Sequence, residues 1–147
     1  MKRVNIEATQ PQAYKAMYGL SHYLSTSKLT KTHQELIKIR ASQINGCAYC
    51  IDMHTTDALK AGETIQRIFL LNAWRETTLF TEEERVILEL TEAITFIHKE
   101  GVNEELYERA AETFDEEYLA QVIMAIATIN TWNRIAISTT LQPPLRA

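Results

Sequence analysis

The feature that most restricts the fold of this chain is the position of its helix-breaking residues. The three prolines are Pro11, Pro143 and Pro144, so they lie near the two ends and the long interior has none. Only four glycines occur in 147 residues. Proline removes a backbone donor and glycine costs conformational entropy in a helix, so a chain poor in both favours helix throughout. We predict an all-α fold.

Apolar residues recur at helical spacing between the remaining turn signals, and they predict helices after an extended lead-in over residues 1–9. Pro11 suits the first position of the first helix. Asn45-Gly46 marks the end of the second helix, because both residues tolerate positive φ. The expected helices cover about 11–25, 32–44, 47–62, 64–74, 82–98, 103–113 and 116–138, and a loose tail follows over 141–147.

Two segments have the spacing of a helix capping box, in which a side chain and a backbone N–H bond reciprocally. Thr81 and Glu84 have this spacing at the start of the fifth expected helix. Thr32 and Glu35 have it at the start of the second, which would make Glu35 a capping residue. His98 is expected in the last turn of the fifth helix, where it would cap the negative end of the helix dipole.

Charge and composition argue against several classes of function. The chain has 15 basic and 19 acidic residues, a net charge of −4 and no Lys/Arg run, so neither nucleic acid nor an anionic membrane is an expected partner. No apolar run reaches membrane-spanning length and no signal-peptide pattern opens the chain, so we expect a soluble protein of the cytoplasm. We expect one domain over residues 1–147, without a nucleotide cofactor, because no linker or Gly-rich phosphate loop occurs.

Both cysteines and one of the four histidines lie in the segment Gly46-Cys47-Ala48-Tyr49-Cys50-Ile51-Asp52-Met53-His54. Cys47 follows a turn signal and is expected at the start of a helix. A helix advances about 100° per residue, so Cys47, Cys50 and His54 fall within roughly 60° on one face. A helix N-terminus favours thiolate over thiol, and an imidazole one turn away can accept or return a proton. The pattern predicts dithiol redox chemistry.

Spacing alone leaves other interpretations of the cysteine pair open. Cys47 and Cys50 could be two small apolar residues of a core. A zinc site formed by Cys47, Cys50, His54 and Glu35 is also chemically possible, since zinc binds sulfur, nitrogen and oxygen ligands. We rank zinc below the dithiol and expect no bound metal, because no second Cys-x-x-Cys pair is present.

Residues 35–54 resemble the core signature of the AhpD-like, carboxymuconolactone decarboxylase superfamily: a glutamate, then Ser-Gln-x-x-Gly-Cys-x-x-Cys, then a histidine after three more residues. Segments 73–85 and 129–134 resemble the family's other two motifs, and the three occur in the family's order over roughly residues 10–138. The resemblance implies a compact all-α domain of about six to seven helices that assembles as a trimer or hexamer through helix packing. The second and third motifs contain four residues that could serve packing or chemistry: Trp74, Trp132, Asn133 and Arg134.

The cysteine-containing members of this family reduce hydroperoxides, and the resemblance implies catalytic roles for Glu35, Cys47, Cys50 and His54. The decarboxylase branch lacks the cysteine pair, so this chain resembles the redox branch. We expect Cys50 to attack the peroxide, because it lies one turn before His54 and matches the family's assignment, and Cys47 to convert the sulfenic acid to a disulfide. The reverse order stays open, because Cys47 is nearer the helix end and is expected to be the more exposed of the two. The chain has Tyr49 where the better-studied peroxidase has a histidine.

The resemblance also raises a second role for Glu35, in which a carboxylate with a pKa raised by burial relays protons to the cysteines. Tyr49 is expected near the cysteines, beside the substrate or in a subunit contact. His22 and His33 do not align with the cysteines and are expected at the surface or at an interface.

The predicted function is a thiol-dependent peroxidase that reduces small-molecule hydroperoxides through a Cys47/Cys50 dithiol–disulfide cycle, with His54 and Glu35 in proton transfer. No bound cofactor is expected. A dithiol electron donor, either lipoyl or thioredoxin-like, must reduce the disulfide again. Two alternatives stay open: a thiol–disulfide oxidoreductase that acts on other disulfides, and a non-enzymatic oligomer that senses redox state.

Overall fold

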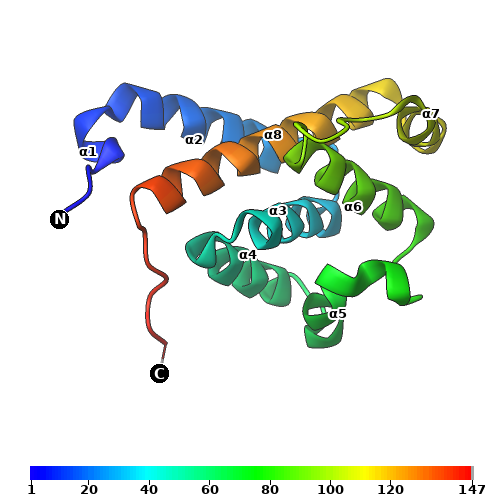
Figure 1. Ribbon diagram of the computed structural model, residues 1–147, viewed down its shortest axis with the longest axis horizontal. Helices are drawn as coiled ribbons and strands as arrows, with labels where there is room; N and C mark the ends of the chain where they lie inside the picture. The colour runs from blue at the N-terminus through cyan, green and yellow to red at the C-terminus, as the bar shows by residue number, and fades with distance from the viewer. Residues whose placement is uncertain (147) are drawn as a thin grey trace.

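The computed structural model describes residues 1–146, and every regular element among them is helical, which confirms the predicted all-α fold (Figure 1). In chain order the elements are α1 (Ile6–Thr9), α2 (Pro11–Ser25), α3 (Lys31–Asn45), α4 (Ala48–Lys60), α5 (Ile65–Leu70), the 3-10 helix η1 (Leu71–Glu76), α6 (Glu82–Thr95), α7 (Glu104–Thr113) and α8 (Glu116–Ser138). No helix within residues 1–146 combines the length and apolar character that crossing a membrane requires.

Local capping signals place the later helices where the sequence predicts them. Thr81 Oγ1 accepts a hydrogen bond from the Glu84 N–H at 3.2 Å, and Glu84 Oε2 accepts one from the Thr81 N–H at 2.8 Å, so the predicted capping box begins α6. Asn103 and Asp115 cap α7 and α8 with their side-chain oxygens. A cap of this kind typically contributes about 1 kcal/mol to stability.

The helix α3 lies at the centre of the molecule, and α4, α6 and α8 pack against it (Figure 1). The helix α2 packs along α8 on one side, and α7 packs against α6 and α8 at the other end. Ile37 of α3, Ile87 of α6 and Ile126 of α8 are fully removed from water in the main core. Burying a side chain of this size stabilises a fold by about 1.5–3 kcal/mol. The main core therefore holds α3 against α6 and α8, and a second apolar cluster, in which Ala58 of α4 joins Leu36 and Ile39 of α3, holds α4 against α3.

Several predictions about helix limits are wrong. The single helix expected over about 64–74 is divided into α5 and the 3-10 helix η1, which continues to Glu76. The lead-in over residues 1–9 is not wholly extended, because the Asn5 side chain caps the short helix α1. The helix α6 ends at Thr95, since Phe96 leaves the helical range with φ −93° and ψ 36°. His98 therefore lies in the turn beyond α6 and does not cap its last turn.

The C-terminal segment runs back past the start of α4 (Figure 1). The Leu141 N–H donates to Ala136 O at 3.0 Å, and Arg146 Nη2 donates to Asp52 Oδ2 of α4 at 2.7 Å. The tail that was expected to be loose thus has contacts with α4 and α8 as far as residue 146, while Ala147 lies outside the described residues. The Arg146 side chain is half exposed, so its ion pair contributes little to stability.

Candidate functional site

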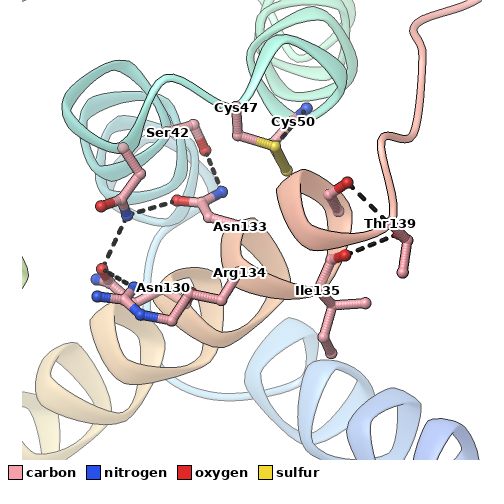
Figure 2. The surroundings of a disulfide bond; sticks show 10 residues. Ser42, Cys47, Cys50, Asn130, Asn133, Arg134, Ile135 and Thr139 are labelled. Carbon is pink, nitrogen blue, oxygen red and sulfur yellow. Dashed lines mark hydrogen bonds between the residues drawn. A yellow bond between two sulfur atoms is a disulfide. The ribbon is translucent and has the colours of Figure 1, made fainter. Parts of the chain in front are cut away.

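The cysteine segment begins where α3 ends. Gly46 adopts a left-handed conformation with φ 71°, which ends α3 and turns the chain so that Cys47 becomes the N-cap of α4. The Cys47 sulfur accepts a hydrogen bond from the Cys50 N–H at 3.3 Å. Cys47 and Cys50 form a disulfide, with their Cα atoms 5.3 Å apart (Figure 2). The two sulfurs therefore meet at the start of a helix, where the sequence predicts them.

A buried set of amide hydrogen bonds fixes the turn beside the disulfide (Figure 2). Asn133 Nδ2 donates to Ser42 Oγ at 2.9 Å. Asn45 Nδ2 donates to Asn133 Oδ1 and to Asn130 Oδ1, both at 2.9 Å. These bonds join the end of α3 to α8, and Ser42 and Asn133 are fully buried. Asn133, whose role the sequence leaves open, therefore positions the segment that carries Cys47.

Glu35 and His54 face each other across the α3–α4 interface. His54 Nδ1 lies 3.5 Å from Glu35 Oε2, which is too long for a strong hydrogen bond, and neither atom has another partner within residues 1–146. The second carboxylate oxygen of Glu35, Oε1, lies 2.8 Å from Lys31 Nζ and 3.3 Å from Lys38 Nζ. Glu35 is 3% exposed and His54 is 9% exposed, so this interaction is shielded from water.

The capping role predicted for Glu35 is wrong. Thr30 caps α3, because its side chain accepts the His33 N–H at 3.1 Å, so the helix begins before the predicted cap at Thr32. Glu35 consequently lies in the second turn of α3, on the side that faces α4.

The predicted rise in the pKa of Glu35 is also wrong. Burial raises the pKa of Glu35, but the His54 imidazole and the ammonium groups of Lys38 and Lys31 outweigh burial and hold the pKa at about 2. Glu35 therefore stays ionised near neutral pH. It can act as a fixed negative charge beside His54, but it is a poor proton carrier. Sequence reasoning missed Lys31 and Lys38, although their spacing from Glu35 on one helix is the spacing of ion pairs.

An apolar cavity of about 280 Å³ lies beside the disulfide, between α2, α3, α4 and α8. Cys50, His54 and Tyr49 line this cavity, whereas Cys47 and Glu35 do not. The expected position of Tyr49 near the cysteines is confirmed. Most of the wall is apolar or aromatic and includes Tyr14, Tyr18, Met53, Ile129, Trp132 and Ile135.

Three aromatic rings form one wall of the cavity. Tyr14 stands edge-on to both Tyr18 and Trp132, with ring centroids 5.2 Å apart in each pair. Trp132 Nε1 donates to Ser21 Oγ of α2 at 2.9 Å, so α8 and α2 are joined at this wall. Trp132 thus has a packing role at the cavity, while Arg134 is exposed and bonds to Asn130 on its own helix.

The two cysteines are almost equally buried. Cys47 is 1% exposed and Cys50 is 2% exposed, so the expectation that Cys47 is the more exposed of the two is wrong. Cys47 packs against Ala136 of α8 and has no contact with the cavity.

The remaining histidines and Trp74 lie outside the cavity. His22 is at the surface, as expected. The prediction for His33 is wrong, because its ring is buried with Nδ1 2.6 Å from the Tyr118 hydroxyl, and burial lowers its pKa. Trp74 is buried and donates to Glu92 Oε1 at 2.8 Å, which is a packing role. Within residues 1–146, no three His, Cys, Asp or Glu side chains are grouped so that they could hold a metal ion.

Comparison with known proteins identifies a family and several relatives of this chain. Residues 11–93 match the model of the carboxymuconolactone decarboxylase family. The uncharacterized protein YdfG of Bacillus subtilis (strain 168) is 47% identical over 137 residues, which are 93% of this chain and 93% of that protein. The crystal structure of ATU0492 from Agrobacterium tumefaciens, a protein of unknown function and suggested antioxidant defence protein AhpD, has a TM-score of 0.95 at 38% identity and covers 99% of this chain and 100% of its own. The debrominase Bmp8, solved in complex with 2,3,4-tribromopyrrole, shares the fold alone, with a TM-score of 0.78 at 18% identity over 93% of this chain and 73% of its own.

Proposed function

This chain belongs to the carboxymuconolactone decarboxylase family and to its AhpD-like, Cys-x-x-Cys branch, and from that premise we propose that it is a thiol-dependent peroxidase. One observation carries the proposal. The sulfur pair at the start of α4 has one member, Cys50, on the wall of an apolar cavity that His54 also lines. A debrominase has the same fold, so the fold by itself does not select the reaction.

In the proposed oxidative half-reaction, the Cys50 thiolate attacks the outer oxygen of a hydroperoxide held in the cavity. The O–O bond breaks, the alcohol leaves with a proton, and Cys50 becomes a sulfenic acid. The Cys47 thiolate then attacks the Cys50 sulfur, water leaves, and the disulfide forms. Cys50 lies in the first turn of α4, where the positive end of the helix dipole favours its thiolate.

His54 is the proposed proton carrier and Glu35 the charge that supports it. Because His54 Nδ1 faces Glu35 at 3.5 Å, the other ring nitrogen is left to exchange protons with Cys50 and the departing alcohol. The ionised carboxylate of Glu35 stabilises the imidazolium that forms when His54 accepts a proton, and Glu35 itself stays unprotonated. This division of roles replaces the proton relay through Glu35 that the sequence suggests.

An external dithiol must return the disulfide to its reduced form, and of the two expected donors the lipoyl group is proposed for this half-reaction, because its dithiol is not part of a folded surface. We also propose that the chain assembles as a trimer or hexamer, as the resemblance to the family implies. The alternative in which the dithiol reduces protein disulfides is less well supported, because a cysteine that is 2% exposed offers little surface to a folded partner.

The test is consumption of cumene hydroperoxide with dihydrolipoamide as electron donor. We expect turnover by the native chain, and none by Cys50→Ser. Cys47→Ser should form a sulfenic acid once, which dimedone traps, without turning over. The two serine variants are matched controls, since both lose the disulfide and only one loses the attacking sulfur. Wild-type turnover in Cys50→Ser would refute the proposal.

A further inference from the structure

The exposure of the residues that line the cavity shows where the cavity opens. Cys50 and Ala136 are buried and lie at its inner end. Three other lining residues, Tyr18, Met53 and Leu141, are exposed. These three belong to α2, to α4 and to the segment that follows α8, so those parts of the chain border the mouth of the cavity.

The end of α8 turns the chain toward this mouth. Thr140 adopts φ 57°, a left-handed conformation that β-branched residues rarely adopt. The Leu141 N–H then donates to Ala136 O at 3.0 Å. A strained backbone of this kind persists only where the surrounding structure maintains it. The turn therefore fixes Leu141 against the cavity and does not let the chain continue along the axis of α8.

Beyond Leu141, one ion pair attaches the chain to α4 (Figure 1). Arg146 donates with both terminal nitrogens to the two carboxylate oxygens of Asp52, which follows Cys50 by two residues. The Pro143–Pro144 pair restricts the intervening chain to extended conformations, because proline fixes its own φ and disfavours helix in the residue before it. Residues 142–146 are otherwise mostly exposed, so the ion pair is the main attachment of this segment to the described helices.

We propose that residues 141–146 form a gate over the mouth of the cavity, and that the Arg146–Asp52 ion pair holds this gate closed. With the pair formed, Leu141 narrows the opening, and only small guest molecules pass to Cys50. When the pair breaks, the segment can move away from the mouth and bulkier guests enter. The inference concerns access to the sulfur, so it goes beyond the proposed function and holds for any compound that reacts with Cys50.

The ion pair is weak enough for the gate to respond to the surrounding solution. The Arg146 side chain is 50% exposed and that of Asp52 is 28% exposed, and dissolved salt screens ion pairs in such surroundings. Loss of an exposed ion pair should raise the fraction of open molecules about two- to fivefold. Access to Cys50 should therefore rise with ionic strength, and only for guests that are too large for the closed mouth.

The first experiment measures access with two maleimides of different size. The reduced chain is treated near neutral pH with N-methylmaleimide or with the bulkier pyrenylmaleimide, and peptide mass spectrometry follows the label on Cys50. Because both reagents have the same reactive group, the ratio of their rates cancels any change in thiolate reactivity. Arg146→Ala should raise the pyrenyl-to-methyl ratio about two- to fivefold, whereas Arg3→Ala, which removes the same charge at an exposed position, should leave it unchanged. A native ratio in Arg146→Ala would overturn the gate.

Salt and an exchange of charges test the ion pair itself. Raising sodium chloride from about 0.05 M to about 1 M should increase the ratio of the native chain about two- to fivefold and should not change that of Arg146→Ala. Asp52→Arg should also raise the ratio. Combining Asp52→Arg with Arg146→Asp should restore the native ratio, because the pair forms again with its charges exchanged. A double variant that stays as open as Asp52→Arg would refute the role of the pair.

The last experiment tests the side chain that narrows the mouth. Leu141 lines the cavity, whereas Leu145 does not line it and is fully exposed. Leu141→Ala should raise the pyrenyl-to-methyl ratio at least about twofold, and Leu145→Ala is the matched control that should keep the native ratio. Equal ratios in the two variants would overturn the proposal. No hydroperoxide is used in these measurements, so a chain without peroxidase activity can still show the gate, and an active peroxidase can still lack it.

Discussion

Replacing Glu35 with glutamine tests whether this carboxylate is a fixed charge of the fold. Glu35 Oε1 lies 2.8 Å from Lys31 Nζ and 3.3 Å from Lys38 Nζ, while Oε2 faces His54 Nδ1 at 3.5 Å. Glutamine keeps the shape of a protonated carboxyl group and removes its charge. The substitution therefore mimics, at every pH, the state that the native carboxylate reaches only in strong acid.

The magnitude follows from the pKa of Glu35 in the two states. The folded protein holds this pKa at about 2 against an ordinary value of 4.5, a difference that corresponds to about 3 kcal/mol. Because the folded-state pKa is the lower one, the stabilisation is present above pH 4.5 and is lost as the pH falls from 4.5 to about 2. Glu35→Gln should thus be about 3 kcal/mol less stable than the native chain near pH 7, and only about 1 kcal/mol less stable near pH 3.

Urea unfolding followed by far-ultraviolet circular dichroism at about pH 7, 5 and 3 measures this difference. Glu112→Gln, at an exposed position of α7, controls for the loss of one negative charge and should change the unfolding free energy by less than about 0.5 kcal/mol. A Glu35→Gln deficit that stays constant between pH 7 and pH 3 would refute the reasoning. A deficit below about 0.5 kcal/mol at pH 7 would do the same.

Two further predictions concern the turn that carries Cys47. Asn133→Ala removes a fully buried amide with two hydrogen bonds and should lower the unfolding free energy by about 2–4 kcal/mol. Thr131→Ala, at an exposed position of α8, is the control and should lower it by less than about 0.5 kcal/mol. Identical urea midpoints for the two variants would contradict the prediction. Gly46→Ala forces a residue with a side chain to adopt φ 71° and should lower the unfolding free energy by about 1 kcal/mol. Gly19→Ala within α2 is the control and should raise the unfolding free energy by about 0.5–1 kcal/mol. Melting temperatures that shift in the same direction in both variants would show that backbone strain at Gly46 is unimportant.

Much of the fold was predictable because its boundaries depend on local chemistry. Three helices begin at a residue whose side chain accepts a hydrogen bond from the N–H three residues later. These N-cap residues are Asn103, Asp115 and Thr81, the last of which pairs with Glu84. Gly46 ends α3 because the turn needs a positive φ, which is also a local requirement. The meeting of the two cysteine sulfurs followed from helical spacing on such a boundary.

The errors arose where a tertiary contact decided between local alternatives. Thr30 and Thr32 both suit an N-cap. Thr30 caps α3, and its N–H donates to the Tyr118 hydroxyl of α8 at 3.2 Å, so Glu35 lies within the helix and not at its cap. Burial alone would have raised the pKa of Glu35, and its actual direction depends on His54, a residue of another helix. His33 is buried because Tyr118 of α8 packs against it, which no pattern in α3 reveals.

The cavity could not be predicted for a related reason. Its walls combine Tyr14 and Tyr18 of α2 with Trp132 of α8, residues more than a hundred positions apart in the sequence. Their apolar spacing within each helix is the spacing of ordinary core residues, so periodicity does not distinguish a cavity wall from a packed core. Only the packing of α2 along α8 shows that these side chains border a space.

The residues that line the cavity come from different parts of the chain, and this affects how related proteins can diverge. The sulfurs and the imidazole come from one short stretch of α4, whereas α2 and α8, at opposite ends of the chain, supply most of the wall. Substitutions in these outer helices can change which guest molecules fit while the reactive groups keep their positions. Related proteins with this arrangement can therefore differ in the substrates they accept through changes in α2 and α8, while the cysteines and the histidine keep their geometry.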